Sequence, residues 1–232
     1  MEPVQALQAS LLFRSLPEAT ITRELLPRGR TREFARGKFL IQPQDQVNEL
    51  GVVLEGRVQL LHLFDNGSVT LADVLQPPEL MGADLICTRT RLSPYHAVAE
   101  TPARIFFLQA DLLLQAGTLP EDCRQEVLHQ LLTLISQENM KKEYRLAILS
   151  QRGLRDRIMT YLTMQANKRG SRTLAIPMSR EKMADFLCVN RSALSHELSL
   201  MQQEGLLQFE KNIFTLPHWE PPQGSAAKGE GK

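Results

Sequence analysis

Two short stretches near the C-terminus, 179–187 and 190–201, carry apolar residues at the three- and four-residue spacing of helices. Each begins with a residue whose side chain can cap free backbone N–H groups, Ser179 in the first and Asn190 in the second. A tight turn that starts at Cys188 separates the two. The pattern predicts a helix-turn-helix whose buried residues are Met183, Ala184, Leu187, Leu194, Leu198 and Met201.

The opposite face of the second helix is short, polar and free of acidic residues. An Arg on such a face can bond a guanine edge bidentately, while Ser and His side chains can donate or accept hydrogen bonds in a major groove. Ser179 and Arg180, at the start of the first helix, stand where phosphates would pass. A solvated polar face on an ordinary helical hairpin is the alternative interpretation. The predicted DNA contacts are Ser179, Arg180, Asn190, Arg191, Ser192, Ser195, His196 and Ser199.

The residues after this helix alternate between apolar and polar positions over 206–216, with a turn signal at 211–212. Gly205 can end the helix, because glycine readily adopts the left-handed conformation that follows many helices. The alternation predicts two short strands joined by the turn, as in a wing. Upstream, 151–153 has the composition of a hinge, and 154–167 predicts a further amphipathic helix.

The first half of the chain has the short β-rich runs of an antiparallel sheet. Asp65-Asn66-Gly67 is a hairpin signal, and Gly56 between two apolar runs allows a tight turn. The glycines support the fold and do not by themselves indicate a ligand. The pattern predicts an antiparallel roll built from runs at 39–45, 50–64, 69–75 and 95–108.

A long helix is predicted from about Asp122 to Leu149, with one seam of residues at the heptad spacing. Two seam positions are polar, Asn139 and Lys142, which suits an interface between two copies better than the interior of a monomer. An Asn at one core position can pair with its copy across a parallel dimer and fix the register. The alternative is an amphipathic helix that packs on its own roll. The predicted seam consists of Leu128, Leu132, Ile135, Asn139, Lys142, Leu146 and Leu149.

Four motifs resemble the C-terminal domain of the CRP/FNR transcription regulators, and the resemblance extends upstream over most of the chain. The motifs are Pro177-Met-Ser-Arg-Glu181, Ala184-Asp-Phe-Leu187, Arg191-Ser-Ala-Leu-Ser195 and Glu204-Gly-Leu-Leu207. The resemblance implies an α+β protein with an N-terminal antiparallel β-roll like a cyclic-nucleotide-binding domain, a long dimerisation helix and a C-terminal winged helix-turn-helix domain. It further implies a homodimer that regulates transcription by binding palindromic double-stranded DNA and contacting RNA polymerase.

This arrangement predicts a sensor domain over residues 1–120, a dimerisation helix and hinge over 121–150, and a DNA-binding domain over 151–218. The remaining residues, 219–232, are too polar and too rich in Gly and Pro to bury a face. We therefore predict that they form a disordered tail.

The segment that would contact a cyclic nucleotide departs from the resemblance. Ala83 stands where the family has the Glu that contacts the ribose, and Ser93-Pro94 takes the place of the Arg-Ser pair that binds the phosphate. The phosphate would lack its bidentate partner, so cyclic AMP is not the expected effector, although Arg89 and Arg91 lie nearby. Three alternatives for the signal stay open: another small molecule, a redox change or a protein partner. The candidate pocket residues are Gly82, Ala83, Asp84, Arg89, Arg91 and His96.

The placement of cysteine and histidine limits the cofactors. Cys87, Cys123 and Cys188 are isolated from one another, so no iron–sulfur cluster is expected, while thiol sensing by Cys87 or Cys123 stays open. Haem remains a candidate cofactor that would need an axial ligand, and no other metal site is predicted. The candidate haem ligands in the sensor half are His62, His96 and His129.

The distribution of charge along the chain is more informative about function than the overall composition. The chain has 43% hydrophobic residues, 23% charged residues and a formal net charge of +1, as in ordinary globular proteins. Residues 1–149 contain 15 Lys/Arg against 18 Asp/Glu, whereas residues 150–216 contain 10 against 6. The positive surplus lies in the predicted DNA-binding domain, where it would attract phosphate.

Other classes of function have less support. The sequence has no Gly-rich phosphate loop, no Gly-x-Ser-x-Gly elbow and no paired Cys/His spacing, so an enzyme is not expected. A regulatory protein that resembles cyclic-nucleotide-binding subunits and acts on a protein partner would explain the roll but not the winged module. Because no apolar run could span a membrane and the N-terminus does not resemble a secretory signal, we expect a cytoplasmic protein.

Overall fold

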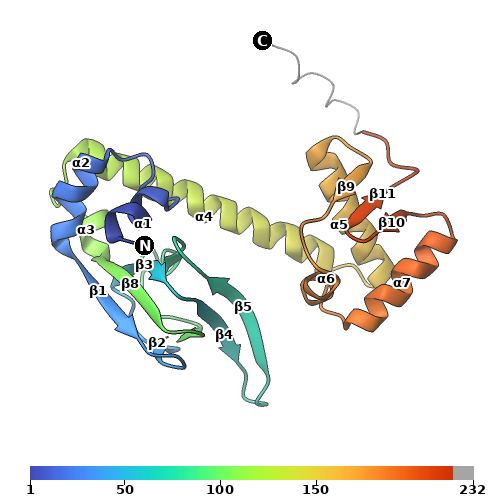
Figure 1. The fold of residues 1–232 in the computed structure, drawn as a ribbon, viewed down its shortest axis with the longest axis horizontal. Helices are drawn as coiled ribbons and strands as arrows, with labels where there is room; N and C mark the ends of the chain where they lie inside the picture. The colour runs from blue at the N-terminus through green and yellow to red at the C-terminus, as the bar shows by residue number, and fades with distance from the viewer. Residues whose placement is uncertain (222–232) are drawn as a thin grey trace, which may run out of the picture. The chain divides into compact units, whose positions relative to one another are not determined.

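The computed structural model describes residues 1–221 and divides the chain into two compact units, Met1–Glu138 and the residues from Asn139 onward (Figure 1). Each unit has a hydrophobic core of its own. Most of the predicted tail, residues 222–232, lies outside the described residues.

Two four-stranded antiparallel sheets form the first unit. One has the strand order β1-β8-β3-β6, with bounds Gly29–Phe34, Ala103–Gln109, Glu49–Glu55 and Leu80–Met81. The other has the order β2-β7-β4-β5, with bounds Phe39–Ile41, His96–Ala99, Val58–Leu63 and Val69–Leu75. The predicted antiparallel roll is confirmed, and the structure adds β1 and β6, which the sequence pattern did not reveal.

Two glycines make the predicted turns of the roll. Gly56 joins β3 to β4 with a φ of 83°, and a Cβ atom there would lie 2.2 Å from the carbonyl oxygen of Pro102. Only glycine fits this position, because it has no Cβ and tolerates positive φ. Gly67, with a φ of 78°, closes the β4–β5 hairpin, where its N–H donates to the carbonyl of Phe64 at 2.8 Å.

Short helices complete the first unit, and the sequence pattern did not predict them. They are α1 (Pro3–Ala9), α2 (Glu18–Thr20), η1 (Ile21–Leu25), η2 (Leu26–Arg28) and α3 (Ala110–Leu114). Helix α1 contacts strand β3, and Leu7, Phe13 and Ile21 are fully buried in the core. All of these except α1 have at most five residues, which form too few turns for a period to be read from sequence.

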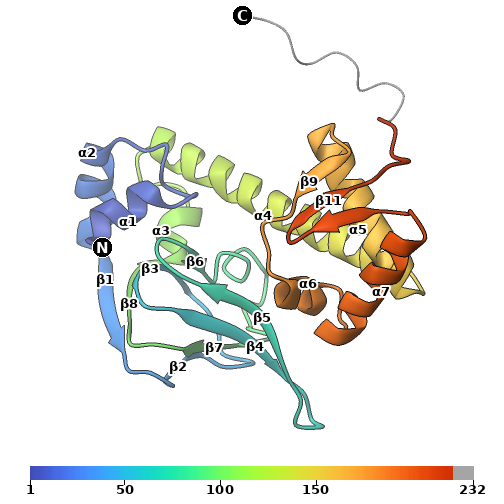
Figure 2. The same ribbon diagram turned by 45° about the vertical axis from the view of Figure 1, so that its right-hand side comes forward.

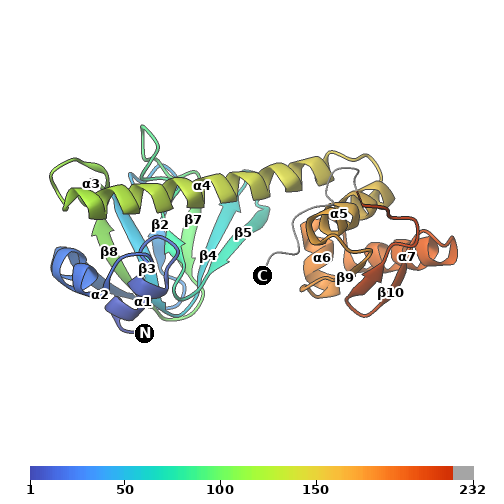
Figure 3. The same cartoon turned by 90° about the horizontal axis from the view of Figure 1, so that it is seen from above.

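The long helix α4 (Glu121–Leu149) confirms the predicted helix within one residue at its start. In the first unit α4 lies along the strands of the roll (Figure 3), and its buried residues Val127 and Leu131 join the core of the roll. Of the predicted seam, Leu132 and Leu146 are 66% and 63% exposed, whereas Leu128 is half-buried and Ile135 packs against the core of the roll. The face that packs on the roll therefore overlaps the predicted seam at Ile135 and leaves Leu132 and Leu146 uncovered.

After the end of α4, the described residues of the second unit form three helices and a small antiparallel sheet (Figure 2). The helices are α5 (Leu154–Arg169), α6 (Arg180–Phe186) and α7 (Arg191–Gln203). The strand order β10-β11-β9 joins Gln208–Glu210, Ile213–Thr215 and Thr173–Ala175. The predicted wing is confirmed, and β9 is a third strand that three residues were too few to reveal. Trp219, at the start of the predicted tail, donates from Nε1 to Oδ1 of Asn167 at 2.8 Å.

None of the helices within residues 1–221 combines the length and the apolar character that crossing a lipid bilayer requires.

Candidate nucleic-acid interface

Two capped helices, α6 and α7, form the candidate interface. The hydroxyl of Ser179 accepts a hydrogen bond from the backbone N–H of Lys182 at 3.2 Å, and Oδ1 of Asn190 accepts one from Ala193 at 2.8 Å. Each cap stabilises its helix by roughly 1 kcal/mol. Between the helices Cys188 adopts the left-handed conformation, with a φ of 56°. The two caps and the turn are where the sequence placed them.

The buried sides of the two helices fix which face of α7 meets solvent. The predicted apolar residues are at most 1% exposed: Met183, Ala184, Leu187, Leu194, Leu198 and Met201. The opposite face of α7 is exposed along its length, at Arg191, Ser192, Ser195, His196 and Ser199. The structure thus brings the predicted base-reading residues together on one accessible face.

Hydrogen bonds orient part of this polar face. The hydroxyl of Ser192 donates to Oδ1 of Asn190 at 2.9 Å, and that of Ser199 donates to the carbonyl of Ser195 at 3.0 Å. These hydroxyl oxygens retain lone pairs that can accept from a base or a bridging water. Among the described residues, none accepts a hydrogen bond from the guanidinium of Arg191. Its five donors are therefore available to a ligand.

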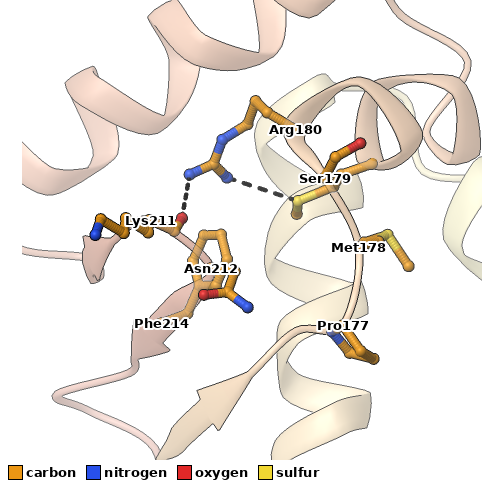
Figure 4. Close-up of a pocket in the computed structure, with 8 residues that line it drawn as sticks. Pro177, Met178, Ser179, Arg180, Lys211, Asn212 and Phe214 are labelled. Atoms are coloured by element: carbon orange, nitrogen blue, oxygen red, sulfur yellow. Dashed lines mark hydrogen bonds between the residues drawn. The ribbon is translucent and has the colours of Figure 1, made fainter.

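Arg180 connects α6 to the wing (Figure 4). Its guanidinium donates to the carbonyl of Lys211 at 2.8 Å and lies 5.0 Å from the ring of Phe209 and 5.1 Å from that of Phe214. Partial burial lowers the pKa of Arg180 from its ordinary value. The sequence suggested a phosphate contact for this residue, and the structure adds a role in holding the wing against α6.

A hollow of about 520 Å³ lies between the start of α6 and the wing turn (Figure 4). It is lined by Pro177, Met178, Ser179, Arg180, Met183, Lys211, Asn212 and Phe214. Lys211 sits at the wing turn with a φ of 52° and an exposed side chain. The sequence pattern identifies this residue only as part of a turn, although a cation at the tip of a hairpin is also suited to contact phosphate.

The candidate effector residues lie on one segment of the roll, but their side chains have different surroundings. Gly82 and Ala83 are buried, whereas Asp84 is exposed and accepts a hydrogen bond from the hydroxyl of Tyr95 at 3.1 Å. Burial, together with the charge of Asp84 and this hydrogen bond, raises the pKa of Tyr95 well above its usual range. Arg89 is exposed.

Arg91 is already engaged within the roll. Its guanidinium donates to Oδ1 of Asp111 at 2.8 Å and to Oδ1 of Asn48 at 3.3 Å. His96 packs its ring 5.3 Å from that of Phe39, and its Nδ1 is buried without a hydrogen-bond partner. These surroundings do not assemble a free cationic pair for a phosphate.

The cysteines are unpaired and separate. Cys87 and Cys188 are exposed and Cys123 is buried. Desolvation raises the pKa of the Cys87 and Cys123 thiols, so both favour the less reactive protonated form at neutral pH. Within residues 1–221, no three His, Cys, Asp or Glu side chains come together in a group that could hold a metal ion.

Comparison with known families gives two matches. Residues 31–117 match the family described as "Cyclic nucleotide-binding domain", and residues 156–220 match the one described as "Crp-like helix-turn-helix domain". Together the matches cover more than half of the chain, in the order roll and then winged module.

Individual proteins resemble the chain over most of its length. The global nitrogen regulator of Synechococcus elongatus is 23% identical over 211 residues, which cover 88% of this chain and 90% of the relative. The transcriptional activator protein FnrA of Stutzerimonas stutzeri is 24% identical over 186 residues, covering 78% and 74%. The structure of the Thermus thermophilus catabolite activator protein matches with a TM-score of 0.55 at 20% identity, covering 89% of this chain and 93% of that one. This last likeness shows a shared fold.

Proposed function

Because this chain belongs to the CRP/FNR family of DNA-binding transcription regulators, we propose that it acts as a homodimer that reads a palindromic operator under the control of a signal received by its β-roll. Members of this family bind DNA as dimers and contact RNA polymerase. We extend both properties, and a cytoplasmic location, to this chain.

The observation that carries the proposal is the exposed, acid-free polar face of α7. It begins with Arg191 and is held outward by the buried stripe of Leu194, Leu198 and Met201. A recognition helix of this kind places its N-terminal residues against base edges in the major groove. The wing, with Lys211 at its turn, and the capped start of α6 flank this face and would contact the adjacent phosphates.

The proposed signal is either a small molecule other than cyclic AMP or a redox change. Arg91 is the nearby cation best placed to replace the missing phosphate partner, but Asp111 and Asn48 already occupy its guanidinium. A ligand phosphate would have to compete with that ion pair. The signal would act by favouring one arrangement of the roll and the DNA-binding unit over another.

The proposed dimer contact is the exposed line of α4. Leu132 and Leu146 are long apolar side chains that neither core covers, and Met140 and Tyr144 are 48% and 53% exposed on the same helix. Leu132 and Leu146 lie two heptads apart and so on one line, whereas Met140 and Tyr144 lie on another side of the helix. Exposed apolar residues grouped on a surface typically mark an interface. Asn139, also exposed, would pair with its copy and set the register.

Replacing Leu132 and Leu146 together with Lys tests this contact. We expect the variant to dissociate at least about tenfold more readily than the parent dimer, because four like charges would enter an apolar seam. Sedimentation over a concentration series measures the change. The exposed His129→Lys variant, on the same helix, is the control for added charge. A double variant that dimerises as tightly as the parent would remove these residues from the interface.

Selection from a pool of DNA duplexes with a randomised centre tests the function as a whole. We expect enrichment of an inverted repeat whose half-sites are centred one helical turn apart or a multiple of it, roughly 34–36 Å per turn. Binding should weaken steeply with salt, because phosphate contacts release counterions. A pool that enriches no sequence would contradict the proposal and favour a regulatory role on a protein partner.

A further inference from the structure

Glu197 of α7 and Glu204, which directly follows the helix, point away from its polar face and contact a single arginine. Glu197 and Glu204 lie two helical turns apart, so they share one side of the helix. At about 100° per residue, that side is nearly opposite the face that carries Arg191, Ser195 and Ser199. Arg155, in the first turn of α5, contacts both carboxylates.

The geometry of this contact is that of a clamp. Nε of Arg155 donates to Oε1 of Glu197 at 2.7 Å, while Nη1 and Nη2 donate to the two carboxylate oxygens of Glu204 at 2.6 and 2.9 Å. Isolated surface ion pairs contribute little to stability. A guanidinium that binds one carboxylate bidentately and a second through Nε contributes geometric specificity as well as charge, because the hydrogen bonds fix its orientation relative to both carboxylates.

We infer that Arg155 is a positioning residue for DNA recognition: it fixes the rotation of α7 about its own axis and so the direction in which the polar face points. This inference rests on the proposed function. The apolar stripe of α7 packs through Leu194, Leu198 and Met201, which are fully buried but have no directional bonds. The Cα atoms of Glu197 and Glu204 are about 10 Å apart along the axis, while their carboxylates converge on one guanidinium. Holding both side chains therefore opposes rotation as well as sliding of the helix.

The first turn of α5 also holds the other helix of the motif. Nε of Arg157 donates to the carbonyl of Gln151 at 3.0 Å, and its Nη1 donates to the carbonyl of Leu187 at 3.3 Å, where α6 ends. The same turn therefore contacts both DNA-reading helices and the segment that enters from α4. This placement suits Arg155 to set the orientation of α7 at the point where the DNA-binding unit begins.

The test compares variants of opposite charge. Arg155→Ala removes a positive charge, whereas Glu197→Gln with Glu204→Gln removes two negative charges from the recognition helix. Each is measured in the full-length protein against the selected duplex and a scrambled duplex of equal length and composition. We expect both variants to lose about tenfold in the ratio of the two affinities, since a tilted face forms its base contacts poorly. The dependence on salt should stay unchanged, because the phosphate contacts are the same in number.

Two control variants accompany the test. Arg155→Lys should retain part of the discrimination, because an ammonium lacks the guanidinium fork, and Lys168→Ala, an exposed charge at the far end of α5, should retain all of it. Opposite changes in discrimination for the two charge variants would be plain electrostatics and would overturn the inference. The inference would also be overturned if both variants kept the full ratio of the two affinities at a temperature at which thermal unfolding shows them to be folded. A parent protein that prefers no duplex would overturn the proposed function itself, and the role of Arg155 with it.

Discussion

Replacing Arg191 with Ala is expected to abolish sequence-specific DNA binding while the dimer and the fold stay intact. Arg191 is the first residue of α7 and is exposed, so its loss leaves no cavity. A bidentate contact with guanine contributes about 1–3 kcal/mol to discrimination between bases. A homodimer makes the contact twice, so the expected loss is roughly 2–6 kcal/mol, or about thirtyfold to more than ten-thousandfold in affinity for the selected site. Titration of the selected and scrambled duplexes measures it.

The exposed basic residue Lys182, on α6, provides the matched control. Lys182→Ala removes the same charge from the same unit, and we expect it to leave the preference for the selected duplex unchanged. If Arg191→Ala weakened binding to both duplexes by the same factor, Arg191 would be a phosphate contact and not a base reader. Unchanged binding to both would remove it from the interface.

Replacing Phe214 with Ala is expected to destabilise the DNA-binding unit by about 3–5 kcal/mol, the usual cost of removing a buried aromatic side chain. Phe214 is 1% exposed, its ring centroid is 5.9 Å from that of Phe209, and the guanidinium of Arg180 lies over it. The change would therefore empty part of the core and loosen the contact between wing and α6. Urea unfolding followed by the fluorescence of Trp219, the single tryptophan of the chain, reports on this unit directly.

Ile213 precedes Phe214 on the same strand and is 48% exposed, so Ile213→Ala is the natural comparison. We expect it to cost less than about 1 kcal/mol, because most of its side chain is already in water. Equal losses for the two variants would mean that strand propensity, and not the buried ring, dominates the stability of the wing.

The helix-turn-helix was predictable because its signals are local. The caps at Ser179 and Asn190 and the apolar stripe of α7 depend on residues within a few positions of one another. The turns at Gly56 and Gly67 were predictable for the same reason, since each needs a backbone conformation that glycine adopts readily. The N-terminal helices and strands β6 and β9 were not, because elements of so few residues are stabilised by partners distant in sequence. Strand β1 was not, because Phe34 is its only large apolar residue and no alternation shows.

In the candidate site, too, the local features were predictable from the sequence and the long-range contacts were not. Periodicity placed the polar residues of α7 on one face, but it gave no indication that Arg180 would hold the wing. That contact joins residues 31 positions apart, to the carbonyl of Lys211. Nor could it pair Arg155 with Glu197 and Glu204, which are 42 and 49 positions away. Long-range ion pairs leave no periodic pattern in a sequence.

The sequence alone therefore determined the order of the parts, the helix-turn-helix and the wing, because caps, turns and periodicity act over short distances along the chain. Only the tertiary structure decided which face of α4 packs on the roll, that Asp111 and Asn48 engage Arg91, and that Arg155 holds α7. These depend on which distant residues the packed core brings within hydrogen-bonding distance, and neighbours in space are not neighbours in sequence.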